Sequence, residues 1–164
     1  MLRLRPMTAD DKPAVMRILQ RTPEFLPEEI PVAEEVCDTY LADPAGAGYQ
    51  AVVAEIDSEV VGYICFGPTP LTRGTWDIYW MAVSPEKKGQ GIGTSLLAHA
   101  EALIKEAVGR LILIETSGES DYANTRAFYR ARGYEPVGSI PDYYAPGLDL
   151  IIFQKRLPPH PCSQ

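Results

Sequence analysis

A glycine-rich segment, Gly89-Gln90-Gly91-Ile92-Gly93, follows an apolar run that ends at Val83 and precedes an apolar-periodic segment that begins at Leu96. This order predicts a strand, a loop and a helix. Glycines leave backbone N–H groups uncovered by side chains, and the N-terminus of a helix favours anions. The segment therefore predicts a cradle for a pyrophosphate group.

Two common phosphate-binding motifs do not fit this spacing. A P-loop needs Gly-Lys-[Ser/Thr], and no lysine stands at that place. A dinucleotide fingerprint would meet Thr94 or Leu96 where it requires its third glycine. The pattern that fits is [Arg/Gln/Lys]-x-x-Gly-x-[Gly/Ala], read as Lys88-x-x-Gly91-x-Gly93. A tight glycine turn that binds no ligand is the structural alternative.

Hydrophobic periodicity predicts the elements that position this loop. The expected strands cover residues 2–5, 50–56, 60–66, 76–83, 111–116, 134–140 and 148–157, with a connection at 141–147. A first helix is expected to begin at Thr8, with Asp11 three residues later as its partner in a capping box. Three further helices are expected over residues 32–41, 96–108 and 121–132. The strand–helix–strand unit from Trp76 to Thr116 must cross right-handed and pair in parallel, so an α/β fold with a mixed sheet is expected.

Four features in this order resemble the GNAT superfamily of N-acetyltransferases. They are the strand ending Trp80-Met81-Ala82-Val83-Ser84-Pro85, the glycine loop, the segment Ala127-Phe128-Tyr129-Arg130-x-x-Gly133-Tyr134, and the terminal Asp142-Tyr143-Tyr144 with residues 148–155. The last feature resembles the closing hairpin of N-terminal protein acetyltransferases, notably the ribosomal-protein alanine acetyltransferases.

The resemblance covers residues 2–157 and implies one GNAT domain over residues 1–157, with residues 158–164 as a flexible tail. The implied fold is a mostly antiparallel sheet of about seven strands, with a central parallel pair that splays apart and about four flanking helices. We see no second domain and no internal repeat.

The resemblance implies acetyl-CoA as the bound cofactor. The amides between Gly89 and Thr94 would hold its pyrophosphate, and Lys88 either adds charge there or is only solvated. A bulge in the preceding strand would expose donors to the thioester carbonyl, and the pantetheine amides would pair along the same strand edge. The expected cofactor-binding residues are Met81, Ala82, Val83, Lys88, Gly89, Gln90, Gly91, Ile92, Gly93 and Thr94.

Three side chains are candidates for proton transfer. Tyr129 matches the general acid that protonates the leaving thiolate, although an aromatic at helical spacing is otherwise a core residue. Glu115 ends the apolar run of residues 111–114, at the carboxyl end of a parallel strand, and matches the base of the N-terminal acetyltransferases. Asp77, in an apolar strand, is the second candidate base. Either carboxylate could instead simply face water.

The chain differs from the family pattern at one position. Family members usually carry an asparagine seven residues before the helix tyrosine, which is Tyr129 in this sequence. Tyr122 occupies that position, and Asn124 lies two residues later, which turns a helix by about 200°. We therefore expect Asn124 to face away from the site. Aromatic side chains that could line an acceptor site, or merely pack, are Trp76, Tyr79, Trp80, Tyr143 and Tyr144.

Composition narrows the function classes. The 164 residues carry a net charge of −7, which argues against a general nucleic-acid binder and is compatible with a cationic substrate. The three cysteines are too few and scattered for a disulfide framework, and neither they nor the two histidines have metal-site spacing. We find no signal peptide and no membrane-spanning run, so a cytoplasmic protein without a metal is expected.

The sequence thus predicts an N-acetyltransferase that moves an acetyl group from acetyl-CoA to a primary amine, by direct attack in a ternary complex. The acceptor is a small-molecule amine or a peptide N-terminus, and the protein is a monomer or homodimer. A non-catalytic acyl-CoA-binding sensor on the same fold is the alternative, since a fold does not determine chemistry. A different nucleotide-binding α/β protein is a third reading.

Overall fold

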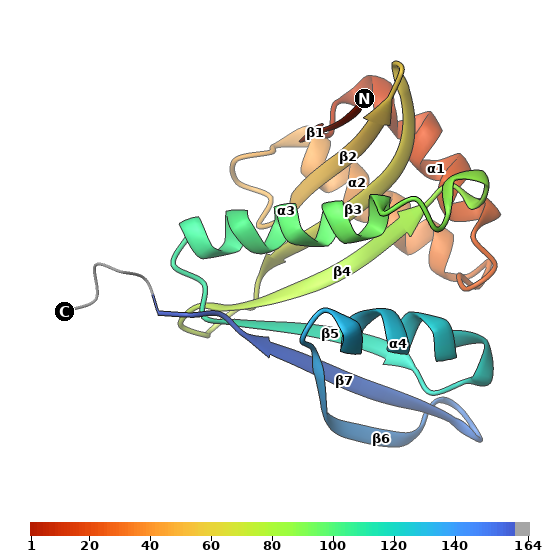
Figure 1. The fold of residues 1–164 in the computed structure, drawn as a ribbon, viewed down its shortest axis with the longest axis vertical. Coiled ribbons are helices and arrows are strands. Elements are labelled where there is room, and N and C mark those ends of the chain that lie inside the picture. Colours follow the sequence, from red (N-terminus) through yellow and green to blue (C-terminus); the bar gives the residue numbers. More distant parts are fainter. Residues whose placement is uncertain (160–164) are drawn as a thin grey trace.

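The computed structural model describes residues 1–159, which form one seven-stranded sheet with helices on both faces (Figure 1). The strand order is β1-β2-β3-β4-β5-β7-β6. The strands are β1 (Leu2–Pro6), β2 (Gln50–Ile56), β3 (Glu59–Pro68), β4 (Thr75–Val83), β5 (Leu111–Ser117), β6 (Glu135–Ala145) and β7 (Leu148–Arg156). The helices are α1 (Lys12–Arg21), α2 (Glu29–Ala42), α3 (Ile92–Glu106) and α4 (Ala123–Ala131). The predicted α/β fold is confirmed.

The two faces of the sheet carry separate apolar cores. Helices α1 and α2 cover one face, where Val15, Leu19 and Cys37 pack against the alternate residues of β2 and β3. Helices α3 and α4 lie over the other face, where Leu96 and Tyr129 join the second core (Figure 1). Because successive strand residues point to opposite faces, the central strands contribute to both cores, and their sequences read as nearly continuous apolar runs.

Strands β4 and β5 form the expected parallel pair, which splays apart. Residues Thr75–Ile78 pair with Leu111–Ile114, and no pairing between the two strands continues beyond Ile78. Strand β4 still pairs with β3 as far as Val83, after a bulge that leaves Tyr79 without a partner. The sheet is therefore continuous at one end of β4 and open at the other.

Most expected boundaries shift by one to three residues; for example, α2 begins at Glu29 rather than at residue 32. Three differences have identifiable local reasons. Strand β6 runs to Ala145, through residues expected to be a connection, because β7 pairs with it on both sides of a bulge. Helix α3 begins at Ile92 rather than Leu96, since Gly91 adopts a left-handed φ of 79° as its N-cap. A short 3-10 helix at Ala9–Asp11 precedes α1; its predicted capping contact forms, and the Thr8 amide donates to Asp11 at 2.8 Å.

Helix α3 lies close against β3, and this fixes the loop that precedes it. A Cβ at Gly62 would lie 2.9 Å from Leu96 Cδ1 and 3.1 Å from Ile92 Cγ2. Because Gly62 has no side chain, the first turns of α3 can approach β3 closely. Of the expected tail, residues 160–164 lie outside the described part of the chain. No helix within residues 1–159 is long and apolar enough to cross a membrane.

Candidate active site

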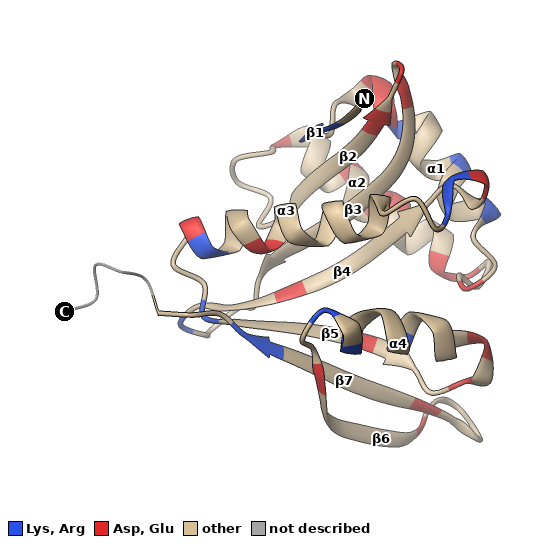
Figure 2. Cartoon of the chain, in the orientation of Figure 1, with Lys and Arg blue, Asp and Glu red and all other residues tan. Residues whose placement is uncertain are grey.

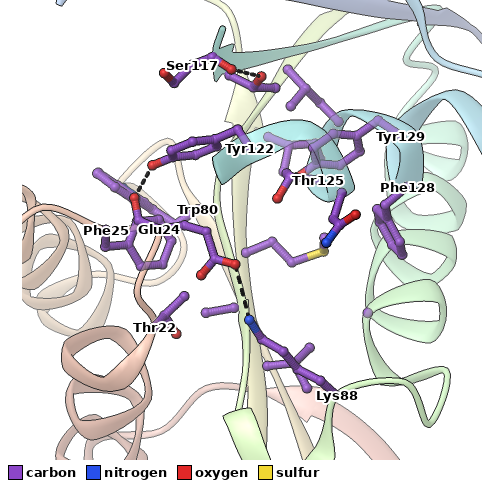
Figure 3. Close-up of a pocket in the computed structure, with 18 of the residues that line it drawn as sticks. Thr22, Glu24, Phe25, Trp80, Lys88, Ser117, Tyr122, Thr125, Phe128 and Tyr129 are labelled. Atoms are coloured by element: carbon purple, nitrogen blue, oxygen red, sulfur yellow. Dashed lines mark hydrogen bonds and ion pairs between the residues drawn. The ribbon is translucent and has the colours of Figure 1, made fainter. Parts of the chain in front are cut away.

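The splayed ends of β4 and β5 open into a cleft of about 940 Å³ (Figure 3). Its walls come from the open half of β4, the end of β5, the first turn of α3, one face of α4 and the loop between α1 and α2 (residues 22–28, the α1–α2 loop). The loop between β4 and α3 (residues 84–91, the β4–α3 loop) closes one end. Five elements that are distant in sequence therefore meet at the interruption of the sheet.

Unpaired amides line the cleft at the start of α3. Among the described residues, no amide from Gly89 to Thr94 donates a hydrogen bond; the first that does is Ser95, to the Gly91 carbonyl at 3.0 Å. Gly89 and Gly91 both have a φ of 79°, and a Cβ at either would meet no protein atom within 4 Å. These amides are therefore free to donate hydrogen bonds to an anion at close range, as the glycine spacing predicted.

The open edge of β4 presents two further amides. Ser84 donates to the Val61 carbonyl at 2.8 Å, so this residue faces β3. Hydrogen-bonding direction alternates along an antiparallel strand, and the amides of Met81 and Val83 therefore point away from β3 toward the gap. Two donors on one rigid strand suit a developing oxyanion or the amides of an extended ligand.

One face of α4 forms the opposite wall. The cleft-lining residues Asn124, Phe128 and Arg132 follow one another at intervals of four residues, as do Thr125 and Tyr129. Asn124 therefore faces the cleft, contrary to our expectation. The expectation assumed that Tyr122 and Asn124 lie in one helix, about 200° apart. Helix α4 instead begins at Ala123, and Asn124 lies one turn before Phe128 on the same face.

Tyr129 brings a free hydroxyl to the cleft. Its side chain is 6% exposed and packs edge-on against Tyr134 and Phe128, with ring centroids 5.8 and 5.4 Å apart. No described residue hydrogen-bonds with the hydroxyl, in contrast to Tyr134, whose hydroxyl donates to Glu101 at 2.9 Å. Burial raises the pKa of Tyr129 to about 12, so the phenol keeps its proton at neutral pH.

Arg132 is a cation that the sequence analysis missed. Its guanidinium lies 3.7 Å from the centroid of the Phe128 ring, and Nε donates to Thr94 Oγ1 at 3.1 Å. The positive charge is thereby held beside the unpaired amides of α3. The signal was present in the four-residue interval between Phe128 and Arg132, but a basic residue near the end of a helix usually has no more than a capping role.

The two candidate bases occupy different surroundings. Glu115 lines the cleft just beyond Ile114, the last residue of β5 that pairs with β4. Partial burial, with the charge of Asp77, raises the pKa of Glu115 above the usual carboxyl value. Asp77 does not line the cleft, and its Oδ2 accepts a hydrogen bond from Thr69 Oγ1 at 2.5 Å. Glu115 is therefore the better placed of the two to meet a ligand.

The α1–α2 loop is held against the cleft through Glu24. Lys88 Nζ lies 3.2 Å from Glu24 Oε1, and the Tyr122 hydroxyl donates to the Glu24 carbonyl (Figure 3). Arg21, the last residue of α1, pairs with Glu86 on the β4–α3 loop. The Phe25 ring also packs edge-on against Trp80, with centroids 5.7 Å apart. Nothing in the local sequence pattern indicated that this loop faces the glycine segment.

Charge is divided between the two ends of the cleft. Lys87, Lys88 and Arg132 line it around the unpaired amides, and Figure 2 shows the corresponding basic colouring on the β4–α3 loop. Of the four carboxylates that line the cleft, Glu24 pairs with Lys88, and Glu29, Glu115 and Glu119 line the remainder. One end thus suits an anion and the other a cation.

Most residues that the sequence singled out do meet in this cleft. All the expected cofactor-binding residues line it except Gln90, and of the five aromatics Tyr79, Trp80 and Tyr144 do so. Cys37 and Cys65 do not, and burial raises the pKa of both thiols, that of Cys65 to about 12. Cys162 and His160 lie outside the described residues. Within residues 1–159, no group of three or more His, Cys, Asp or Glu is arranged to hold a metal.

Comparison with protein families places residues 47–136 in the acetyltransferase (GNAT) domain family. An uncharacterized N-acetyltransferase of Methanocaldococcus jannaschii is 36% identical over 107 residues, or 65% of each chain. Blasticidin-S acetyltransferase of Streptomyces morookaense is 30% identical over 151 residues, which cover 90% of this chain and 92% of that protein.

Solved structures give the same assignment. A protein of Desulfovibrio desulfuricans described as a GNAT-family acetyltransferase superposes with a TM-score of 0.92 at 38% identity, over 95% of this chain and 99% of that one. An aminoglycoside 6'-N-acetyltransferase complexed with coenzyme A shares the fold at 21% identity, with a TM-score of 0.76 over 97% and 99% of the two chains. The chain spans 65% of the M. jannaschii relative and 43% of an uncharacterized Mycobacterium leprae protein that is 27% identical.

Proposed function

Because this chain belongs to the GNAT acetyltransferase domain family, whose members use acetyl-CoA, we propose that it transfers an acetyl group from acetyl-CoA to a primary amine. Residues 1–157 would form the catalytic domain. The transfer would be a direct attack in a ternary complex. This proposal agrees with the positions of the two described cysteines, which are buried away from the cleft and keep their protons, so neither is placed to carry an acyl group.

The observation that carries the proposal is the run of unpaired amides from Gly89 to Thr94 beside the open edge of β4. These amides would bind the coenzyme pyrophosphate, since they are fixed, uncovered by side chains and close to the N-terminus of α3. Lys88 and Arg132 would add positive charge. The fit is favourable because the space beside Gly89 and Gly91 contains no protein atom.

The amides of Met81 and Val83 would polarise the thioester carbonyl and align the pantetheine arm. They belong to a strand that β3 holds in place on its other side, so they need little reorganisation as negative charge develops. A single preorganised donor of this kind lowers a barrier by about 3–4 kcal/mol. Ala82 lies between them and packs into the core under α1 and α2.

Glu115 would accept a proton from the attacking amine, either directly or through water. An alkylammonium group has a pKa of about 10.4, so most of the acceptor arrives protonated at neutral pH. A carboxylate whose pKa is raised is a stronger base than an ordinary one. Asp77 would act on this step through its charge, which contributes to the raised pKa of Glu115.

Tyr129 would donate the proton that the leaving thiolate needs. Its phenol is protonated, free of other partners and located on the cleft wall formed by α4. The apolar packing around its ring fixes the hydroxyl in one place, which a general acid requires. Counted from the ammonium, the acceptor loses two protons: one leaves to solvent through Glu115, and the other balances the proton that Tyr129 gives to the thiolate and then regains.

The test is release of free thiol from acetyl-CoA, measured over a panel of small primary amines and peptides with free N-termini. Turnover with at least one amine supports the proposal, and mass spectrometry of the acetylated product identifies the nitrogen. Calorimetry with coenzyme A, ATP and NAD runs in parallel. Coenzyme binding without any turnover would favour the non-catalytic sensor, and binding of ATP or NAD alone would rule out both readings.

A further inference from the structure

We propose that Glu24 binds a positively charged group of the acceptor, so that the preferred acceptors carry a second cation besides the amine that is acetylated. The inference rests on the proposed function and concerns the acceptor end of the same cleft. It depends on the position of the Glu24 carboxylate, on the aromatic side chains around it and on the separation of charge within the cleft.

The Glu24 carboxylate is held from two directions. Lys88, on the β4–α3 loop, reaches Oε1 at 3.2 Å, and the Tyr122 hydroxyl, at the start of α4, donates to the backbone carbonyl of Glu24 (Figure 3). One contact fixes the side chain and the other fixes the loop. The carboxylate is therefore positioned before any acceptor arrives.

One oxygen of this carboxylate has no donor. Glu24 Oε2 is buried, and no residue within the described part of the chain donates a hydrogen bond to it. A charged oxygen that is removed from water without a partner is costly in a folded protein. Because Glu24 lines the cleft, a donor entering the cleft can supply the missing hydrogen bond. The chemical groups that best satisfy a carboxylate are ammonium and guanidinium.

Aromatic rings surround the same place. Phe25 adjoins Glu24 in the chain and packs edge-on against Trp80, while Tyr122 contacts the Glu24 carbonyl; all three line the cleft. Aromatic faces attract organic cations and pack against the methylene groups that carry them. The combination of one carboxylate oxygen and several aromatic rings suits an alkylammonium group better than a metal ion or an anion.

Two carboxylates are then available for two positive groups. Glu115 lies at the end of β5 and is assigned to the reacting amine, whereas Glu24 lies on the α1–α2 loop. Of the three cations that line the cleft, Lys88 pairs with Oε1 of Glu24, and no described cation pairs with Glu115, so the acceptor end keeps negative charge. The favoured substrate class is therefore an amine with a second ammonium or guanidinium group, such as a diamine or a peptide with a basic side chain.

The experiment compares matched acceptors at saturating acetyl-CoA. In one arm, diaminobutane through diaminooctane are compared with monoamines of equal carbon number. In the other arm, an alanyl-lysine peptide is compared with its norleucine counterpart. We expect kcat/KM for the doubly charged member to be about 10-fold to 100-fold higher in at least one arm, the range for a hydrogen bond to a charged group. The arm in which this occurs distinguishes a small polyamine from a peptide.

Glu24→Gln provides the decisive variant. It should lower kcat/KM for the doubly charged acceptor about 10-fold or more and leave that of the matched monoamine within about 3-fold, so the ratio collapses. Glu28→Gln is the matched control, because Glu28 is exposed, lies on the same loop and does not line the cleft. Lys88→Met removes the ion pair that fixes Oε1 but keeps the Glu24 carboxylate, so a preference for the doubly charged acceptor should remain even though coenzyme binding weakens.

An unchanged ratio in Glu24→Gln, or the absence of any preference for a second cation in the wild type, overturns the inference while leaving the acetyltransferase proposal intact. If no acceptor is turned over, the acetyltransferase proposal fails instead. Equilibrium binding of each diamine and monoamine to the coenzyme-A-loaded wild type and to Glu24→Gln then tests the inference alone. Equal binding by the two proteins overturns it, and loss of the diamine preference supports it.

Discussion

The two ends of the cleft are built from different parts of the polypeptide. At the end between β4 and α3, the binding groups are backbone amides, released by glycines and by the interruption of a sheet. At the other end they are side chains, namely carboxylates and aromatic rings that come from several segments distant in sequence. The first end is suited to a ligand that every family member shares, and the second to a ligand that varies.

The difference shows how one fold can keep a cofactor and change its substrate. Backbone amides remain in place whatever side chains a sequence carries, provided that the glycines and the strand pairing remain. The acceptor end depends on residues such as Glu24 and Tyr122, which can be replaced without disturbing the sheet. The predictions below test this division, from the largest effect to the smallest.

Tyr129, on the cleft wall formed by α4, should give the largest effect. Tyr129→Phe removes only the hydroxyl, which has no partner among the described residues, and should reduce kcat about 10²–10⁴-fold, the range for loss of a general acid. Coenzyme affinity, measured by calorimetry, should be unchanged. Tyr134→Phe is the control: its hydroxyl bonds Glu101 at 2.9 Å outside the cleft, so it should lower stability by about 1 kcal/mol with kcat retained. A fully active Tyr129→Phe enzyme would remove the acid from the mechanism.

Glu115→Gln should lower kcat/KM about 10²-fold, at the low end of the range because water can accept the amine proton in its place. In the wild type, kcat/KM should fall as the pH drops through the pKa of Glu115, which burial and the charge of Asp77 raise above the usual value. This acidic limb should be absent in Glu115→Gln. The measurement is kcat/KM against pH for both proteins with the same acceptor.

Asp77→Asn distinguishes the two carboxylates. Removing the negative charge of Asp77 should lower the pKa of Glu115, because that charge is one cause of its increase. The acidic limb of the pH profile should therefore move to lower pH, with turnover retained. If Asp77→Asn abolished turnover while Glu115→Gln did not, the assignment of the base would be reversed.

Gly91→Ala tests the end that is built from backbone. A non-glycine residue at a φ of 79° is strained by about 1–2 kcal/mol, and the added methyl group would project into space that contains no protein atom. Coenzyme affinity should fall about 10-fold as the amides shift. Gly48→Ala is matched, with a φ of 75° and an equally open surrounding, but Gly48 does not line the cleft. It should show similar destabilisation in thermal unfolding and normal coenzyme binding; equal losses of affinity would contradict the assignment.

Arg132→Gln should give the smallest effect, about a 3-fold to 5-fold loss of coenzyme affinity, since the guanidinium is partly exposed to solvent. The affinity of the wild type should also depend more strongly on salt than that of the variant. Calorimetry at low and high ionic strength measures both. Identical salt dependence would show that Arg132 does not act on the bound anion.

The architecture and the backbone-built end were predictable because their signals are local. Glycine spacing, apolar periodicity and the Ser-Pro break after Val83 all lie within a few residues of the structure they determine. The exceptions are boundaries that depend on neighbours. Pro141 and Asp142 indicate a turn, yet β6 continues through them because β7 supplies a partner on both sides of the bulge.

The side-chain-built end was mostly not predictable. Glu24 and Lys88 are 64 residues apart, and no periodic pattern in the α1–α2 loop indicates which way it folds. The orientation of Asn124 was predicted wrongly because the start of α4 determines which residues face the cleft, and helix boundaries are the least certain part of a sequence-based assignment. Arg132 and Phe128 carried a usable signal in their four-residue spacing.

The interruption between β4 and β5 also bears on self-association. An unpaired strand edge at the rim of a sheet can recruit strands from other chains and seed aggregates. Here the unpaired stretch of β4 lies in the interior of the sheet order, with β5 and β7 beyond it and α4 lining the opening. The protein thus keeps an edge with free hydrogen-bonding capacity where a thin, extended molecule can reach it and the bulk of a neighbouring sheet is obstructed.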